Sequence, residues 1–524
     1  MPIRQGADSR PQRNTPKQKA KSEQLDPKET PIRQGGLILT HKISFGTDGW
    51  RGIIADDFTF DNVRLVARAV AAYINSQGLA ERGLVVGHDN RFLAEEFTAA
   101  VAEELNSQGI PVFLCRGATP TPVTAYAIKL TNAAGAVMLT ASHNPPVYNG
   151  FKFIPEYAGP ALPHITKQIE ENIARLQAGE PCDVYGLEPA QGRYGRLPQP
   201  ELKEGARCTG YSPFDGYVRH ISGIVDLAAI KRAGLKVVID PMYGAGIGYL
   251  EHILGNAGVQ VEVFHNYRDP FFGGSLPEPT GKSLEELKGR VKAGGANLGL
   301  ALDGDADRFG IIDANGEYIT PNQFLPLLYY HLLTARGWRG PVARTVATTH
   351  LLDRMAAKYG QPVYETPVGF KYIGQNLLEK GCILGGEESG GLSVKGHIPE
   401  KDGILAGLLA AEMVAHHGKS LTEILEQIYR EFGRLFSERL DLHTTPEQKA
   451  QILEQLKGWA PPELAGQQVT GKITLDGTKL VLADGAWILI RPSGTEPLFR
   501  VYVEANSLEQ KAQLQREVKQ MLQL

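Results

Sequence analysis

Residues 135–145 read GAVMLTASHNP, an apolar run from Gly135 to Leu139 followed directly by a short polar loop that contains Ser142. The run predicts a buried strand, and Pro145-Pro146 stops regular structure from continuing. Ser142 would then lie at the carboxyl edge of a sheet, where open α/β folds bind ligands. A hydroxyl is a weak nucleophile that needs a base, a metal or prior modification. For this loop alone a buried turn serine is the simpler interpretation, and other segments of the chain overturn it.

A second apolar run ends in a cluster of carboxylates. Residues 298–308 read LGLALDGDADR, so Asp303, Asp305 and Asp307 stand at alternate positions after a predicted strand. Three carboxylates this close repel one another strongly without a cation between them. Oxygen ligands without His or Cys suit Mg²⁺ or Ca²⁺ better than Zn²⁺. An EF-hand loop is disfavoured because Arg308 replaces the required glycine, and a solvated acidic turn is the remaining alternative.

Two glycine-rich loops complete the set of motifs. Residues 385–391 read GGEESGG, and residues 491–497 read RPSGTEP. The second resembles an anion cradle, because it offers a guanidinium fork, two hydroxyls and a glycine that lets backbone amides approach, at Arg491, Ser493, Thr495 and Gly494. Each loop alone is weak evidence, since glycine-rich turns are common in proteins.

Together, in this order and at these separations, the motifs resemble those of the α-D-phosphohexomutase family, which includes phosphoglucomutases and phosphomannomutases. The resemblance begins at residues 45–52, FGTDGWRG, and runs to the last predicted helix. Phosphomannomutase-like members usually carry a Met where this chain has Glu388. The loop with Glu388 and the stretch HIPEKDG at residues 397–403 are similar to the phosphoglucomutase branch.

The resemblance implies a reaction in which a hexose 1-phosphate and its 6-phosphate interconvert through a bound hexose 1,6-bisphosphate, which also acts as activator. It implies that Ser142 carries a phosphoryl group and contacts one Mg²⁺ held by Asp303, Asp305 and Asp307. Lys152 matches the position of a general base, and among other cations we expect its pKa to be lowered. The alternative is a plain counter-ion, and His143 either holds the loop or moves a proton.

Further site residues follow from the same resemblance. Arg51 and Arg308 are implied as positive groups near the phosphoserine, and Glu387 and Ser389 as the pair that binds two sugar hydroxyls. A cationic wall that meets the bisphosphate is implied at Lys371, His397 and Lys401. The clamp on the distal phosphate is implied at Arg491, Ser493, Gly494, Thr495 and Arg500.

Composition describes an ordinary globular protein. Of its 524 residues, 42% are hydrophobic and 22% charged, and 55 basic against 58 acidic side chains give a net charge of −3. This balance argues against a general binder of nucleic acid or membrane surfaces, so we expect small sugar phosphates as partners. Four separated cysteines fit a reducing cytoplasm. No apolar run is long enough for a membrane span. The chain is expected to be a monomer or a small homo-oligomer.

The pattern of strands and helices predicts an α/β protein. Apolar runs at residues 84–87, 110–114, 135–139, 235–240, 259–264, 298–302, 343–348, 363–365 and 382–384 alternate with helical stripes such as residues 61–77 and 94–108. We therefore expect three related, mostly parallel α/β/α modules and a C-terminal α+β domain around a central cleft. The expected boundaries are a disordered tail at 1–40, domain I at 41–180, a linker at 181–212, domain II at 213–315, domain III at 316–430 and domain IV at 431–524.

Three other functions stay open at this point. A phosphomannomutase or dual-specific enzyme would use the same loops, because the two sugars differ only at C2. A glucose-1,6-bisphosphate synthase would keep the loops but release the intermediate. A sugar-phosphate sensor without turnover would be a non-enzyme, and the intact Ser142, aspartate triad, Lys152 and Arg491 argue against it.

Overall fold

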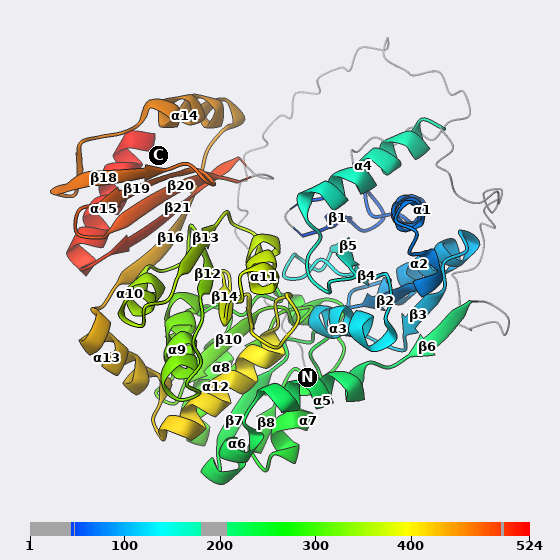
Figure 1. Cartoon of the computed structure of the whole chain (residues 1–524), viewed down its shortest axis with the longest axis horizontal. Coiled ribbons are helices and arrows are strands. Elements are labelled where there is room, and N and C mark those ends of the chain that lie inside the picture. The colour runs from blue at the N-terminus through cyan, green and yellow to red at the C-terminus, as the bar shows by residue number, and fades with distance from the viewer. Residues whose placement is uncertain (1–42, 47, 180–206, 494–496, 524) are drawn as a thin grey trace, which may run out of the picture. The chain divides into compact units, whose positions relative to one another are not determined.

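The structure, a computed structural model, describes residues 43–46, 48–179, 207–493 and 497–523, and its strands form four sheets (Figure 1). Three sheets are mixed, and the fourth is antiparallel throughout. The predicted tail at residues 1–40 lies outside the described residues, as does most of the predicted linker. No helix in the described part of the chain is long and apolar enough to cross a membrane.

The first sheet has the strand order β1-β5-β4-β2-β3-β6. Strand β4 spans Gly135–Leu139, as the apolar run predicts, and all five of its residues are buried. Helix α1 begins after Thr59, whose side chain accepts a hydrogen bond from the Asn62 backbone N–H. The other elements are β1 (Trp50–Ile53), β2 (Leu84–His88), β3 (Val112–Cys115), β5 (Tyr148–Pro155), β6 (Cys208–Tyr211), α1 (Phe60–Ser76), α2 (Ala94–Ser107), α3 (Thr121–Thr131), α4 (Pro163–Gln177) and the 3₁₀ turn η1 (Ala80–Arg82).

The second sheet has the order β11-β10-β9-β7-β8. Its central strand β9, Leu298–Leu302, is fully buried and ends at the three aspartates. The other elements are β7 (Lys236–Asp240), β8 (Gln260–Val263), β10 (Phe309–Asp313), β11 (Tyr318–Ile319), α5 (Phe214–Ile224), α6 (Leu227–Ala233), α7 (Tyr249–Asn256), α8 (Glu285–Gly294) and the 3₁₀ turn η2 (Phe272–Gly274).

The third sheet has the order β13-β12-β14-β15. Its elements are β12 (Val342–Thr345), β13 (Val363–Thr366), β14 (Leu384–Gly386), β15 (Leu392–Val394), α9 (Pro321–Thr334), α10 (Leu351–Lys358), α11 (Phe370–Glu379), α12 (Gly403–His417) and α13 (Leu421–Phe432). Helix α12 packs against the helices α6 and α7 and the strands β9 and β10 of the second module (Figure 1). Because α12 is apolar on nearly all sides, the second and third modules share one continuous core.

The fourth sheet is the antiparallel sheet, with the order β16-β21-β20-β19-β18-β17, and it confirms the expected change to an α+β domain. Helix α15 packs against β16 and β21. The elements are β16 (Phe436–His443), β17 (Glu463–Leu464), β18 (Gln467–Ile473), β19 (Thr478–Leu482), β20 (Trp487–Pro492), β21 (Leu498–Ala505), α14 (Pro446–Gly458) and α15 (Leu508–Leu522).

The sheets of the three modules are mostly parallel, as expected, but each contains one antiparallel strand that the sequence did not predict. After β4, β9 and β14 the chain does not enter a helix but turns back as β5, β10 and β15, each antiparallel to the strand before it. Each motif loop therefore connects two paired strands, and both of its ends are anchored in the sheet. Such short, doubly anchored loops hold side chains more rigidly than long crossovers do.

The last residues of the predicted linker, which was expected to span residues 181–212, form a strand of the first sheet. Cys208–Tyr211 forms β6, which pairs in parallel with β3 at the edge of the first sheet. The chain therefore returns to the first module before it enters α5.

Candidate active site

The loop between β4 and β5 is organised by a buried arginine, Arg91, which follows β2. Its guanidinium donates hydrogen bonds to four backbone carbonyls of the loop region, those of Ser142 (2.6 Å), Asn144 (2.8 Å), Pro145 (2.9 Å) and Tyr148 (2.9 Å). Its Nε lies 3.2 Å from the Asp89 carboxylate. These contacts satisfy loop carbonyls that the sheet does not pair.

Arg91 was not identified from the sequence as the residue that holds the serine loop. The only signal is the run HDNR at residues 88–91, which follows a predicted strand and so lies at the same carboxyl edge as Ser142. Ser142 itself adopts a left-handed backbone with φ of 51°. That conformation is unfavourable for a residue other than glycine, and the Arg91 contacts hold it in place.

The Ser142 hydroxyl meets the aspartate loop. Its Oγ donates a hydrogen bond to Asp303 Oδ2 at 2.9 Å and lies 3.3 Å from His143 Nδ1, and the residue is 1% exposed. Gly304 allows this approach, because a Cβ at that position would lie 2.6 Å from the Ser142 carbonyl oxygen. The structure thus brings two of the predicted motifs into direct contact across 161 residues of sequence.

The three aspartates form a buried, convergent group. Asp303, Asp305 and Asp307 each offer a carboxylate oxygen, and these oxygens lie within 4.8 Å of one another. Burial, followed by the charges of the other two aspartates, raises the pKa of Asp303 well above its ordinary value. Among the described residues, the buried Oδ1 atoms of Asp305 and Asp307 have no hydrogen-bond partner. Orphaned carboxylate oxygens in an all-oxygen set fit a hard divalent cation such as Mg²⁺.

Lys152 corrects one expectation. Its Nζ lies 2.9 Å from Asp305, 3.1 Å from Asp307 and 3.0 Å from Asp48, and it is buried. Burial alone would lower its pKa, but the three carboxylates outweigh burial and raise it above the ordinary lysine value. The expected lowered pKa is wrong, because the nearest groups are anions and not the cations that the sequence suggested.

Lys401 joins the same group from the third module. Its Nζ lies 3.1 Å from Asp48 and 3.2 Å from Asp307. Burial alone would lower the pKa of Lys401, but these carboxylates outweigh burial and raise it well above the ordinary lysine value. Asp48 thus bridges Lys152 and Lys401, a role that sequence reasoning did not assign to it.

Further predicted cations surround the serine loop. Arg51 donates to the Asn144 side chain at 2.6 Å, and the Arg308 backbone N–H donates to Asp303 Oδ1 at 3.0 Å. The charge of Arg308, then burial, then the charge of Arg51 lower the pKa of His143 well below its ordinary value. His143 is therefore neutral near pH 7, and one of its ring nitrogens can accept a hydrogen bond.

The loop between β14 and β15 presents Glu387 and the half-buried Ser389. Glu387 Oε1 accepts a hydrogen bond from the Gly369 N–H at 3.0 Å. Burial and then the neighbouring Glu388 charge raise the pKa of Glu387 to about 7. Lys371 lies two residues after Gly369 in α11, and burial lowers the pKa of its ammonium group.

His397 does not belong to this cationic group, contrary to the expectation. Its side chain is fully buried, with Nε2 2.9 Å from Asp402 and Nδ1 3.0 Å from His220. Asp402 in turn caps α12 and accepts a hydrogen bond from the Tyr217 hydroxyl at 2.7 Å. Both ring nitrogens are engaged inside the fold, so His397 supports α12 and is not available to a ligand.

The C-terminal domain places Arg491 in β20 directly opposite Arg500 in β21, with the buried Ser493 just beyond. Each of these arginines has an acidic neighbour, since Arg491 Nε donates to Asp476 at 2.8 Å and Asp441 of β16 is the strand partner of Arg500 on its other side. Gly494 and Thr495, the other expected clamp residues, lie outside the described residues.

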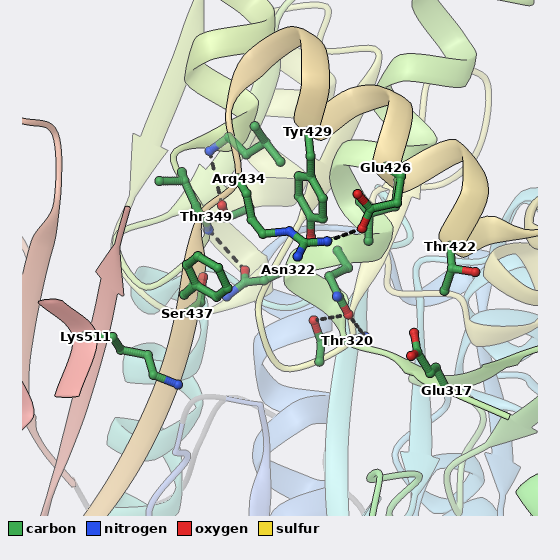
Figure 2. A pocket seen from close by; sticks show the side chains of 15 residues that line it. Glu317, Thr320, Asn322, Thr349, Thr422, Glu426, Tyr429, Arg434, Ser437 and Lys511 are labelled. Carbon is green, nitrogen blue, oxygen red and sulfur yellow. Dashed lines mark hydrogen bonds and ion pairs between the residues drawn. The ribbon is translucent and has the colours of Figure 1, made fainter. Parts of the chain in front are cut away.

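A separate pocket of about 520 Å³ lies between the third module and the C-terminal domain (Figure 2). Figure 2 shows the Arg434 guanidinium directed at Glu426, with which it forms an ion pair. Lys511, another lining cation, is paired with Glu438 at 2.6 Å. Glu317 adds a further carboxylate to the lining, so the charges around this pocket are mixed and not predominantly positive.

Comparisons with known proteins agree on one family. Profiles of the phosphoglucomutase/phosphomannomutase family match four stretches of the chain in order. Residues 42–180 match the α/β/α domain I, residues 215–316 domain II, residues 320–432 domain III and residues 445–521 the C-terminal domain.

Individual relatives carry different substrate names. A phosphoglucomutase/phosphomannomutase from Thermococcus kodakarensis is 32% identical and aligns over 89% of this chain and 95% of its own length. A probable phosphoglucosamine mutase from Pyrococcus abyssi is 31% identical over 91% of this chain and 97% of its own. The crystal structure of a suggested phosphomannomutase from Thermus thermophilus superimposes with a TM-score of 0.77 at 33% identity, covering 92% of this chain and all of that one.

Proposed function

Because the chain belongs to the phosphoglucomutase/phosphomannomutase family, whose members are phosphohexomutases, we propose that it is a phosphoglucomutase. It interconverts glucose 1-phosphate and glucose 6-phosphate through a phosphorylated serine and a bound glucose 1,6-bisphosphate. The observation that carries this proposal is the Ser142 hydroxyl, 2.9 Å from Asp303 within a buried group of three aspartates and two lysines.

In the proposed cycle the phosphorus–oxygen bond to Ser142 Oγ breaks, and a new bond forms to the free hydroxyl oxygen of the sugar phosphate. That hydroxyl gives up its proton, and Ser142 Oγ receives one. In the second half the other phosphate of the bisphosphate returns a phosphoryl group to Ser142. Phosphoryl transfer depends mainly on positioning and on charge stabilisation, which a dense group of fixed charges supports.

Asp303, Asp305, Asp307 and the Ser142 oxygen are the ligands that would hold Mg²⁺. When bound, the cation would neutralise charge on the transferred phosphoryl group. Lys152 and Lys401 are assigned as counter-ions, since both ammonium groups lie within 3.2 Å of the carboxylates of Asp48 and Asp307. His143, which is neutral and 3.3 Å from Ser142 Oγ, is assigned to proton exchange at that oxygen.

The rest of the site is assigned to substrate binding. Arg51, Arg308 and Lys371 would contact phosphate groups near the serine. Glu387 and Ser389 would bind two sugar hydroxyls. The distal phosphate would be held by Arg491, Ser493, Gly494, Thr495 and Arg500.

Glucose is the proposed sugar because of Glu388 and of the stretch at residues 397–403. The names of the relatives leave mannose and glucosamine as alternatives. A change at C2 alters one or two hydrogen bonds, each worth about 0.5–1.5 kcal/mol, so we expect measurable activity on mannose 1-phosphate, about ten-fold slower or more.

Two measurements test the proposal. The first compares kcat/KM for glucose, mannose and glucosamine 1-phosphates at saturating Mg²⁺ and bisphosphate, and preference for another sugar would overturn the glucose assignment alone. The second compares the intact mass of the native protein with that of Ser142→Ala. We expect one phosphoryl group in the first and none in the second. A phosphate on another residue would overturn the mechanism.

A further inference from the structure

Asp476 lies in the turn between β18 and β19 and joins two parts of the proposed substrate site. Its Oδ2 accepts a hydrogen bond from Arg491 Nε at 2.8 Å and a second from the backbone N–H of Val368 at 3.0 Å. Arg491 belongs to the C-terminal domain, and Val368 precedes α11 in the third module. One carboxylate oxygen thus connects the two domains.

The segment that Asp476 holds also contacts the sugar loop. Val368 is followed by Gly369, whose N–H donates to Glu387 Oε1 at 3.0 Å. Two successive backbone N–H groups therefore point to two different carboxylates, one in the sugar loop and one beside the phosphate clamp. The shared segment fixes the distance between the groups proposed to read the sugar and those proposed to hold its distal phosphate.

Asp476 also determines how Arg491 presents its donors. A guanidinium has five N–H donors in a planar fork. Because Asp476 accepts the Nε–H, the two terminal amino groups remain as the pair of donors that can hold a phosphate with two hydrogen bonds.

The turn is built to sit against the Arg491 backbone. Gly477 has a φ of 94°, and a Cβ at this position would lie 2.5 Å from the Ile490 carbonyl oxygen and 3.1 Å from Arg491 Cα. Only glycine allows the turn to come this close without strain. Beside it, Val346, Ala347 and Val368 of the third module pack against Trp487, Leu489 and Tyr502 of the C-terminal domain.

We propose that Asp476 is a positioning residue for the phosphohexomutase reaction, which orients Arg491 toward the distal phosphate and latches the C-terminal domain to the Val368-Gly369 segment. This inference rests on the proposed role of Arg491 in phosphate binding. The chain offers a matched control in Asp484, which also precedes a glycine in a turn of the same sheet but bonds to Gln510 and to the Ala486 N–H.

The test is a double-mutant cycle on the full-length enzyme with glucose 1-phosphate, Mg²⁺ and bisphosphate. Asp476→Ala should raise KM about ten-fold with a smaller change in kcat, because phosphate binding is lost in the ground state and the transition state alike. Asp476→Glu should recover part of the loss, and Asp484→Ala should leave KM unchanged. In an Arg491→Ala background, Asp476→Ala should raise KM by clearly less than in the wild-type background, since the contact with Arg491 is already absent and only the bond to the Val368 N–H remains to be lost.

Each outcome separates the inference from the proposed function. If Arg491→Ala itself leaves KM unchanged, the proposed phosphate clamp is wrong. If Arg491→Ala raises KM but Asp476→Ala does not, the inference alone is overturned. An equal effect of Asp476→Ala in both backgrounds would also overturn it, because Asp476 would then act on the fold. Asp476→Asn, which keeps the side-chain shape, serves if the alanine variant does not fold, and it should raise KM in the same direction.

Discussion

Lys152→Met removes the buried cation that holds three aspartates together. The Lys152 ammonium lies within 3.1 Å of Asp48, Asp305 and Asp307, and Lys401 contacts only two of these. The variant therefore leaves the buried Asp305 with the Thr121 hydroxyl at 2.7 Å but without a lysine in direct contact. Breaking a buried ion pair in this way costs about 3–5 kcal/mol, and we expect a loss of that size when divalent cations are absent.

A divalent cation should offset much of this loss. A ligand at a hundred times its dissociation constant stabilises the folded protein by about 2.7 kcal/mol. Removal of Lys152 also removes a positive charge that repels the metal, so Mg²⁺ should bind the variant more tightly than it binds the wild-type site. The difference in stability between the two proteins is therefore expected to narrow when Mg²⁺ replaces the chelator.

The assay is thermal and urea unfolding with EDTA and with excess Mg²⁺, comparing transition midpoints because a chain of several domains need not unfold in two states. Lys167→Met is the control, since its ammonium is exposed and lies 3.8 Å from Glu171 one helical turn away. Equal midpoints for Lys152→Met and wild type in EDTA, or a gap that Mg²⁺ does not narrow, would refute the electrostatic argument.

Three further predictions concern metal and pH. Chelation should abolish mutase activity and Mg²⁺ should restore it, and full activity of Asp305→Asn after chelation would remove the triad from the mechanism. The pKa of Glu387 is raised to about 7 from 4.5, mainly by burial, so its stabilising effect is complete below pH 4.5 and is lost as pH rises through 7. Glu387→Gln should therefore gain up to about 3 kcal/mol at pH 8, measured by urea unfolding, while kcat/KM falls. Burial alone would raise the pKa of Glu412, but the hydrogen bonds of His331 and Arg336 and the charge of Arg336 outweigh burial and lower this pKa to about 2. It stabilises the fold above pH 4.5, and an acid titration of Glu412→Gln should lack the loss of about 3 kcal/mol expected as pH falls toward 2.

The sequence by itself determined the strands that carry the site. The runs at residues 135–139 and 298–302 are apolar throughout, and they form β4 and β9 with the predicted bounds. The aspartate spacing after β9 places three carboxylates in one short loop, and this local arrangement predicts a hard cation without any tertiary information. Motif order was enough to identify the family.

Only the tertiary structure decided how the side chains act. The contacts of Lys152 with Asp305 and Asp307 span more than 150 residues of sequence, and these neighbours reverse the direction of its pKa shift. His397 stands in a motif but is enclosed by Asp402 and His220, whereas Arg91 stands outside every motif and holds the serine loop. A pKa or a hydrogen-bond partner depends on which groups lie within a few ångströms, and for these residues the fold alone brings those groups together.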